Sequence, residues 1–154
     1  MTIRVLFVCL GNICRSPMAE AVFAHKVREA GLSERIEADS AGTGSWHVGE
    51  RPHSGTRRVL AANNISYDHC ARTLFPSDLN DFDYIITMDE TNLRDVLRMG
   101  RGRARVAPLM SYAANSGWIE VPDPYYTGRF DEVYHLVDQA TEGLLAMIRR
   151  EHEI

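Results

Sequence analysis

Near its start the sequence reads Ile3-Arg4-Val5-Leu6-Phe7-Val8-Cys9-Leu10-Gly11-Asn12-Ile13-Cys14-Arg15-Ser16-Pro17. Residues 3–8 form a short apolar, β-rich run, which predicts a strand buried on both faces. Ser16 is a favoured N-cap and Pro17 is favoured at the first helical position, so we expect a helix to open here. Apolar residues then follow at mostly helical spacing until Gly31 ends the pattern. The stretch therefore predicts a strand, a tight loop and a helix.

The alternation of strands and helices continues along the chain. A second strand is predicted over 36–41, and strand–helix–strand is the βαβ signature of a parallel sheet. Further strands are predicted over 84–88 and 105–107, and further helices over 54–64, 91–99 and 130–148. This pattern indicates an α/β fold, a three-layer α/β/α arrangement around a four-stranded parallel sheet. Ligands of such sheets bind beyond the carboxyl ends of the strands, where the loop after Val8 lies.

Length and composition describe one ordinary domain. With 154 residues the chain is long enough for a single sizeable core, so residues 1–154 are predicted to form one domain. Hydrophobic residues make up 45% and charged residues 25%, as in soluble globular proteins. The net charge is −4 and no block of like charge stands out, which argues against a general nucleic-acid binder.

The cysteines and the first residues indicate the compartment. The chain has three cysteines, Cys9, Cys14 and Cys70, which do not make a disulfide framework and so favour a reducing cytoplasm. The apolar start runs into Gly11-Asn12 too soon for a signal peptide, and no stretch approaches the roughly 18 apolar residues of a membrane span. We expect a cytoplasmic protein without a membrane span, and a monomer, although the sequence leaves the oligomeric state open.

The loop from Cys9 to Ser16 combines the parts of an anion site. Backbone N–H groups of a tight loop and of a helix N-terminus bind anions, and the same positive field favours thiolate over thiol. Arg15 can add a planar, bidentate clamp on phosphate oxygens. Gly11 permits backbone angles that other residues resist, and the Ser16 hydroxyl can donate to the Cys9 sulfur. A lone cysteine at a strand end is usually buried packing, but this combination indicates a nucleophile beside a phosphate cradle.

Several motifs resemble one enzyme family. The segment Cys9–Ala21 looks like the signature of the low-molecular-weight protein tyrosine phosphatases, and the segments Asp39–Thr43, Tyr84–Asp89 and Asp123–Tyr126 match that family in order and spacing. The similarity covers essentially the whole chain. It implies a Rossmann-like fold of the phosphotyrosine phosphatase I type. It also implies a protein-tyrosine-phosphatase, a phosphoric monoester hydrolase that acts on phosphotyrosine and small aryl phosphates.

A phosphatase also needs an acid for the leaving group. Pro122 and Pro124 flank Asp123 and stiffen its turn, which suits a group held at one position. Asp-Pro alone is usually only a turn signal, and the family resemblance implies that Asp123 is the general acid and base. Cys9 would attack phosphorus to form a cysteinyl-phosphate, with Arg15 and the loop amides stabilising the phosphoryl oxygens. This chemistry needs no metal or other cofactor.

The resemblance further implies residues that brace the loop. Asn12, Ser40 and His69 match family positions whose side chains support the phosphate loop, and Ser16 belongs with them. From the residues alone, His69 is more often a surface or a satisfied core histidine. Asp89 ends a predicted strand and is interpreted as the N-cap of the next helix, with no role in the site.

The pocket around the phosphate is expected to have aromatic walls. A phosphotyrosine ring lies between apolar surfaces while its phosphate reaches the loop, and the expected walls are Trp46, Tyr125 and Tyr126. From the loop itself, the substrate-binding residues are expected to be Leu10, Gly11, Asn12, Ile13, Cys14 and Ser16. Family members that prefer phosphoarginine tend to carry threonine at the position of Ile13, so Ile13 favours phosphotyrosine. Cys14 remains open between packing and a redox partnership with Cys9.

Other functions share this kind of loop. An arsenate reductase needs two further cysteines for its disulfide relay, and only Cys70 follows Cys14. A phosphocysteine carrier has no use for Asp123 or an aromatic pocket, and an idle phosphotyrosine-binding module has no use for an intact Cys9. The expected partners are a phosphotyrosine-containing protein as substrate and inorganic phosphate as product, and no nucleic acid. The arginine-rich stretch 99–105 is interpreted as a solvated loop, with docking of acidic substrates as the alternative.

Overall fold

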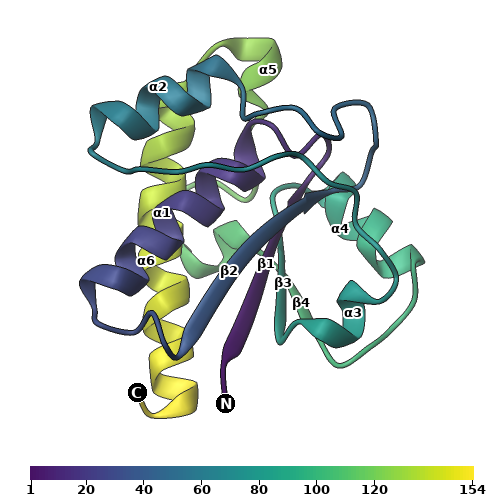
Figure 1. Cartoon of the computed structure of the whole chain (residues 1–154), viewed down its shortest axis with the longest axis vertical. Coiled ribbons are helices and arrows are strands. Elements are labelled where there is room, and N and C mark those ends of the chain that lie inside the picture. Colours follow the sequence, from purple (N-terminus) through teal and green to yellow (C-terminus); the bar gives the residue numbers. More distant parts are fainter.

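The computed structural model describes residues 1–154 and has a parallel sheet between two layers of helices (Figure 1). The strands are β1 (Ile3–Cys9), β2 (Ile36–Gly42), β3 (Tyr84–Thr87) and β4 (Arg105–Pro108). The helices are α1 (Arg15–Glu29), α2 (Ser54–Ala62), α3 (Asp78–Asp81), α4 (Glu90–Arg98), α5 (Pro124–Thr127) and α6 (Phe130–His152), with a 3-10 turn η1 (Leu109–Tyr112). The predicted four-stranded α/β fold is confirmed.

The order of the strands decides where a ligand can bind. The sheet has the order β2-β1-β3-β4, with every neighbouring pair parallel. The chain passes from β1 through α1 to β2, and then crosses to β3 on the other side of β1. In open α/β sheets such a reversal opens a crevice at the carboxyl ends of the strands. The loops after Cys9 and after Thr87 leave the sheet at this point.

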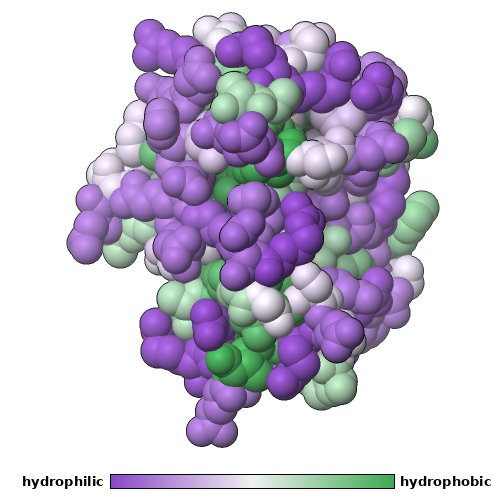
Figure 2. Space-filling model, turned by 60° about the vertical axis from the view of Figure 1, so that its left-hand side comes forward, coloured by the Kyte–Doolittle hydropathy of each residue, from purple (hydrophilic) through white to green (hydrophobic).

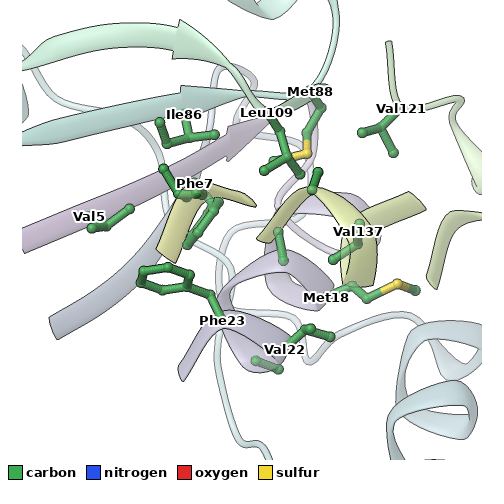
Figure 3. Packing of buried hydrophobic residues seen from close by; sticks show 14 of the residues in the cluster. Val5, Phe7, Met18, Val22, Phe23, Ile86, Met88, Leu109, Val121 and Val137 are labelled. Carbon is green, nitrogen blue, oxygen red and sulfur yellow. The ribbon is translucent and has the colours of Figure 1, made fainter. Parts of the chain in front are cut away.

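Strand β1 is buried on both faces, as predicted. Phe7 faces the layer of α1 and α6 and meets Phe23 edge-on, with 5.4 Å between ring centroids; Figure 3 shows both rings in this cluster. Leu6 and Val8 face the opposite way, into a smaller cluster with α3 and α4. Figure 1 shows α1 and α6 on one side of the sheet and α3 and α4 on the other. The strand that carries Cys9 is therefore held by packing on both sides.

The start of α1 differs from the prediction. The helix begins at Arg15, Cys14 occupies the N-cap position, and no side chain caps the first turn. The prediction of Ser16 as N-cap was therefore wrong. The physical reason is that the Ser16 hydroxyl is engaged with Cys9 and Asn12, which leaves the first N–H groups of the helix uncapped at the site.

Other boundaries shifted by a few residues. Helix α6 continues to His152, beyond the predicted end at residue 148, with two arginines and a histidine in its last turn that suit the helix dipole. The short elements α3, α5 and η1 were not predicted, because four residues are too few to show a hydrophobic period.

The arginine-rich stretch 99–105 lies before and at the start of β4, at the end of the sheet away from the Cys9 loop. Arg103 pairs with Asp83, and Arg105 pairs with Glu151 at 2.8 Å. These ion pairs offset much of the positive charge, so the stretch offers little to an acidic substrate.

Figure 2 shows a face on which hydrophilic residues predominate and apolar residues form small separate patches. None of the helices combines the length and the apolar character that crossing a bilayer requires.

A substitution at Gly143 tests how tightly α6 packs against η1. A Cβ atom at this position would overlap the backbone oxygen of Tyr112, so Gly143→Ala must displace η1. We expect the variant to lower the free energy of unfolding by about 1–3 kcal/mol, although helix propensity alone would raise it by about 0.5–1 kcal/mol. Urea denaturation measures the difference. Gln139→Ala, at an exposed position of the same helix, is the control; a stabilised Gly143→Ala would contradict the packing argument.

Candidate active site

A pocket of about 230 Å³ opens beyond the carboxyl end of β1. It brings together three segments that lie far apart in the sequence: the loop after β1, the segment after β2 and the turn before α5. Its lining residues are Cys9, Leu10, Gly11, Ile13, Cys14, Arg15, Trp46, His47, Asp123, Tyr125 and Tyr126. The loop, the predicted acid and the three predicted aromatic walls therefore face one cavity.

The Cys9 sulfur is the last acceptor in a chain of hydrogen bonds that runs from Asn12 through Ser16. Its Sγ is 3.0 Å from the Ser16 Oγ, and both residues are buried. The Asn12 Nδ2 donates to the same Ser16 oxygen at 2.8 Å. Because the Ser16 hydroxyl accepts from Asn12, its own proton is left to point at the Cys9 sulfur.

Asn12 is the centre of the loop's support. Its φ of 57° places it in the left-handed region, which is uncommon for any residue but glycine. The amide donates to Ser16 and, at 3.0 Å, to Ser40, while its oxygen accepts from the Arg72 backbone N–H at 3.0 Å and from His69 Nε2 at 2.7 Å. Four hydrogen bonds thus hold one fully buried side chain in a strained conformation.

A second layer of side chains holds the first. Ser40 donates to Glu20 Oε1 at 2.7 Å, and the Tyr67 hydroxyl donates to the same oxygen at 2.8 Å. Burial raises the pKa of Glu20 to about 7, although both hydrogen bonds favour its charged form. Burial also lowers the pKa of His69, which leaves a neutral ring to donate Nε2–H to Asn12.

Glu20, Asp39 and His69 are the one group of side chains spaced for a metal, with ligand atoms within 4.8 Å of one another. Each has protein partners, since Asp39 accepts from the Ser40 N–H at 2.8 Å and pairs with Arg72 at 3.1 Å. We therefore assign the group to the support of the loop.

Arg15 is buried between two carboxylates. Its guanidinium donates to Asp89 at 2.6 Å and to the Val121 carbonyl at 3.1 Å, and it lies 3.4 Å from Asp123. Burial by itself lowers the pKa of Arg15, but Cys9, Asp89 and Asp123 more than offset this, so the pKa is raised. The Nε–H of Arg15 is buried and has no hydrogen-bond partner, which leaves one donor of the fork for an anion.

Asp123 stands across the pocket from the loop. It is the N-cap of α5, where its Oδ1 accepts from the Tyr125 N–H at 3.1 Å, and Pro124 begins the helix. Its other carboxylate oxygen is the one near Arg15. One oxygen is thus fixed by the turn while the other faces the cation, and the carboxylate remains a quarter exposed toward the pocket.

The pocket walls include His47, which the sequence did not reveal. The Tyr125 ring is close to His47 and to His53, with ring centroids 6.2 and 6.0 Å away. A Cβ atom at Gly11 would lie 3.0 Å from the His47 ring, so glycine allows this ring to pack on the loop. Trp46 and Tyr126 are 72% and 78% exposed, which places them at the rim of the pocket and not in the core.

Cys14 also lines the pocket. Burial, reinforced by the neighbouring Cys9, raises the pKa of Cys14 to about 12, so it stays a neutral thiol and does not compete as a nucleophile. Both cysteines are free thiols.

The predicted residues thus divide into two groups. Asn12, Ser16, Ser40 and His69 lie behind the loop and do not line the pocket, so the side chains of Asn12 and Ser16 support the loop while their backbone remains part of it. Asp89, Glu20 and His47 were missed. Asp89 could have been found, because it lies two residues after the end of β3, at the same edge of the sheet as Cys9.

Comparisons with known proteins agree on one family. The family model described as "Low molecular weight phosphotyrosine protein phosphatase" matches residues 4–154. The low molecular weight protein-tyrosine-phosphatase YfkJ of Bacillus subtilis is 48% identical over 155 residues, which cover 99% of each chain. The crystal structure of YfkJ superposes with a TM-score of 0.95 and covers 98% of this chain and 97% of that one.

Two further relatives come from eukaryotes. A low molecular weight phosphotyrosine protein phosphatase of Schizosaccharomyces pombe is 51% identical over 142 residues, which cover 88% of this chain and 91% of the relative. The structure of the drosophila arginine phosphatase DARP has a TM-score of 0.90 at 33% identity and covers 96% of this chain and 98% of that one.

The buried Glu20 predicts a pH-dependent stability. Because its pKa is raised from 4.5 to about 7 on folding, the folded state binds this proton more tightly than the unfolded state, and the free energy of unfolding falls as pH rises between these values. Glu20→Gln should remove this loss, so that the variant gains up to about 3 kcal/mol relative to the wild type between pH 4.5 and pH 8.

Urea denaturation at several pH values tests this expectation. Glu34→Gln, at an exposed position, is the matched control and should follow the wild type at every pH. A constant difference between Glu20→Gln and the wild type at all pH values would contradict it.

Proposed function

The chain belongs to the low molecular weight phosphotyrosine protein phosphatase family and is a protein-tyrosine phosphatase, and we propose that Cys9 is its nucleophile, Arg15 its phosphate clamp and Asp123 its general acid and base. One observation carries these assignments. Cys9, Arg15 and Asp123 all line a single pocket with aromatic walls, and the buried Nε–H of Arg15 has no partner within the protein.

In the first step the Cys9 thiolate attacks phosphorus and forms a P–S bond. The bond from phosphorus to the tyrosyl oxygen breaks, and the departing oxygen takes the proton of Asp123. Loop N–H groups and Arg15 donate to the phosphoryl oxygens, where negative charge is spread in the transition state. The buried fork of Arg15 is already oriented by Asp89, so little reorganisation is needed when the anion arrives.

In the second step water attacks the cysteinyl-phosphate. Asp123, now a carboxylate, takes a proton from this water, and the P–S bond breaks to release phosphate and the Cys9 thiolate. The Ser16 hydroxyl, 3.0 Å from the sulfur, stabilises the leaving thiolate. Both steps use only side chains and backbone donors of this chain, so we propose a metal-independent reaction.

The pocket favours an aromatic substrate. Trp46 and Tyr125 offer ring faces on which a phosphotyrosine ring can pack, and the apolar Ile13 of the loop lines the same cavity. A phosphoarginine would bring a polar guanidino group against the same apolar surface.

A nucleophilic thiol also has to stay reduced, which supports a cytoplasmic location for this protein.

Two substitutions test the catalytic roles. Cys9→Ser should lower kcat for an aryl phosphate by at least about three orders of magnitude, because it removes the nucleophile. Asp123→Asn should lower kcat for phosphotyrosine by about 10²–10³-fold, and less for 4-nitrophenyl phosphate, whose leaving group needs less protonation.

Phosphate release in the presence of EDTA is the measurement, with phosphoarginine as a second substrate. Cys70→Ser and Asp131→Asn, both at exposed positions outside the pocket, are the controls and should keep wild-type rates. Full activity of Cys9→Ser would refute the nucleophile, and an equal loss for both leaving groups in Asp123→Asn would refute the acid. Faster turnover of phosphoarginine than of phosphotyrosine would overturn the substrate preference.

Asp89 is expected to act through Arg15. Asp89→Asn keeps a good N-cap for α4 but loses the charged partner that orients the guanidinium, so kcat/KM for an aryl phosphate should fall about tenfold or more. Asp95→Asn on the same helix, which breaks only an exposed contact with Arg98, serves as the control. An unchanged kcat/KM in Asp89→Asn would show that Arg15 needs no such partner.

A further inference from the structure

A second hollow, of about 480 Å³, adjoins the catalytic pocket. Leu10, Arg15 and Asp123 line both, so the two cavities meet along one rim. From this rim the second hollow runs between the first turn of α4 and the segment 117–122. We call it the α4 groove. Its remaining lining residues are Asp89, Thr91, Asn92, Gly117, Trp118, Ile119, Glu120, Val121 and Pro122.

The α4 groove has a fixed outer wall. The Val121 N–H donates to the Met88 carbonyl at 2.8 Å, and the Val121 carbonyl accepts from Arg15. The Glu120 carboxylate accepts from the Glu90 N–H at 2.6 Å, which ties the wall to the start of α4. The groove is therefore built on contacts to the sheet, to α4 and to the catalytic arginine.

This wall exposes apolar side chains beside the site. Ile119 is 86% exposed and Trp118 is 42% exposed, although both lie within one groove that leads to the pocket. Aromatic and branched side chains exposed next to a binding site are typical anchors for a partner. In the catalytic pocket, Trp46 and Tyr125 remain to pack against the phosphotyrosine ring itself.

The charge of the α4 groove complements a basic segment. Its lining has three carboxylates, on Asp89, Glu120 and Asp123, and a single cation, Arg15. Arg15 is already shared between Asp89 and Asp123, so the Glu120 carboxylate has no cationic partner in the groove. Beyond the phosphate pocket, the surface thus changes from one that attracts anions to one that attracts cations.

We propose that the α4 groove binds the polypeptide on one side of the phosphotyrosine, and that it selects segments with a basic residue and an apolar residue. The proposal rests on the proposed function, because the phosphotyrosine in the pocket delivers its flanking chain to the shared rim. The apolar side chain packs on Trp118 and Ile119, and the basic side chain pairs with Glu120. Small aryl phosphates do not reach the groove.

The test compares three substrates with a set of variants. The substrates are 4-nitrophenyl phosphate, a phosphotyrosine peptide flanked on both sides by lysine and leucine, and the same peptide with glutamate in place of lysine. The groove variants are Trp118→Ala and Glu120→Lys. The matched controls are Leu97→Ala, which truncates an exposed apolar residue of α4 outside the groove, and Glu34→Lys, which changes the net charge equally at the far end of the sheet.

We expect the wild type to prefer the lysine peptide. Trp118→Ala should lower kcat/KM for both peptides by about tenfold, and Glu120→Lys should reduce or invert the preference between them by about fivefold. Both variants should keep wild-type kcat/KM for 4-nitrophenyl phosphate, and both controls should behave as wild type with all three substrates.

Three outcomes would overturn the proposal. They are equal rates of the wild type on the two peptides, an unchanged peptide preference in Glu120→Lys, and a loss in Trp118→Ala that is the same for peptides and 4-nitrophenyl phosphate. None of these outcomes contradicts the proposed phosphatase reaction, provided that the wild type hydrolyses the aryl phosphate and Cys9→Ser does not. Failure of the wild type on all three substrates would instead refute the proposed function, and the α4 groove proposal with it.

Discussion

The structure of the site depends on the four hydrogen bonds of the Asn12 side chain. A left-handed residue in the middle of a loop is costly, and here the cost is offset because both hydrogens and both acceptor positions of one amide are used in a buried setting. The same amide directs the Ser16 proton toward Cys9. Backbone shape and the environment of the nucleophile are therefore set by a single side chain, and Ser40, His69 and Glu20 serve to hold it.

Charge is balanced at the other end of the loop. Arg15 is nearly fully buried, which is tolerable because Asp89 and Asp123 face it from two different loops. Asp89 begins α4 and Asp123 begins α5, so one guanidinium fastens two helix starts to the phosphate loop. The Nε–H of Arg15 has no hydrogen-bond acceptor within the protein, which suits the binding of a dianionic ligand.

The same geometry links the chemistry to the surface around it. Because Arg15 also binds the Val121 carbonyl, the segment 117–122 is held beside the pocket, and its exposed Trp118 and Ile119 become part of the approach to the site. Arg15 would then serve both catalysis and the positioning of the segment that binds the flanking chain.

The sequence alone indicated the architecture and the candidate reacting groups. The period of the apolar residues indicated the parallel sheet, and the spacing from Cys9 to Arg15 indicated a phosphate loop, because these signals are local. Asp123 was assigned through the resemblance to the phosphatase family, since an Asp-Pro turn alone does not mark an acid. The tertiary structure decided the rest. Asp89, Glu20 and His47 act through partners 3 to 74 positions away, and Ser16 gave up its expected cap for Cys9. Such choices depend on which side chains compete for the same hydrogen bond in space, and no periodicity records that competition.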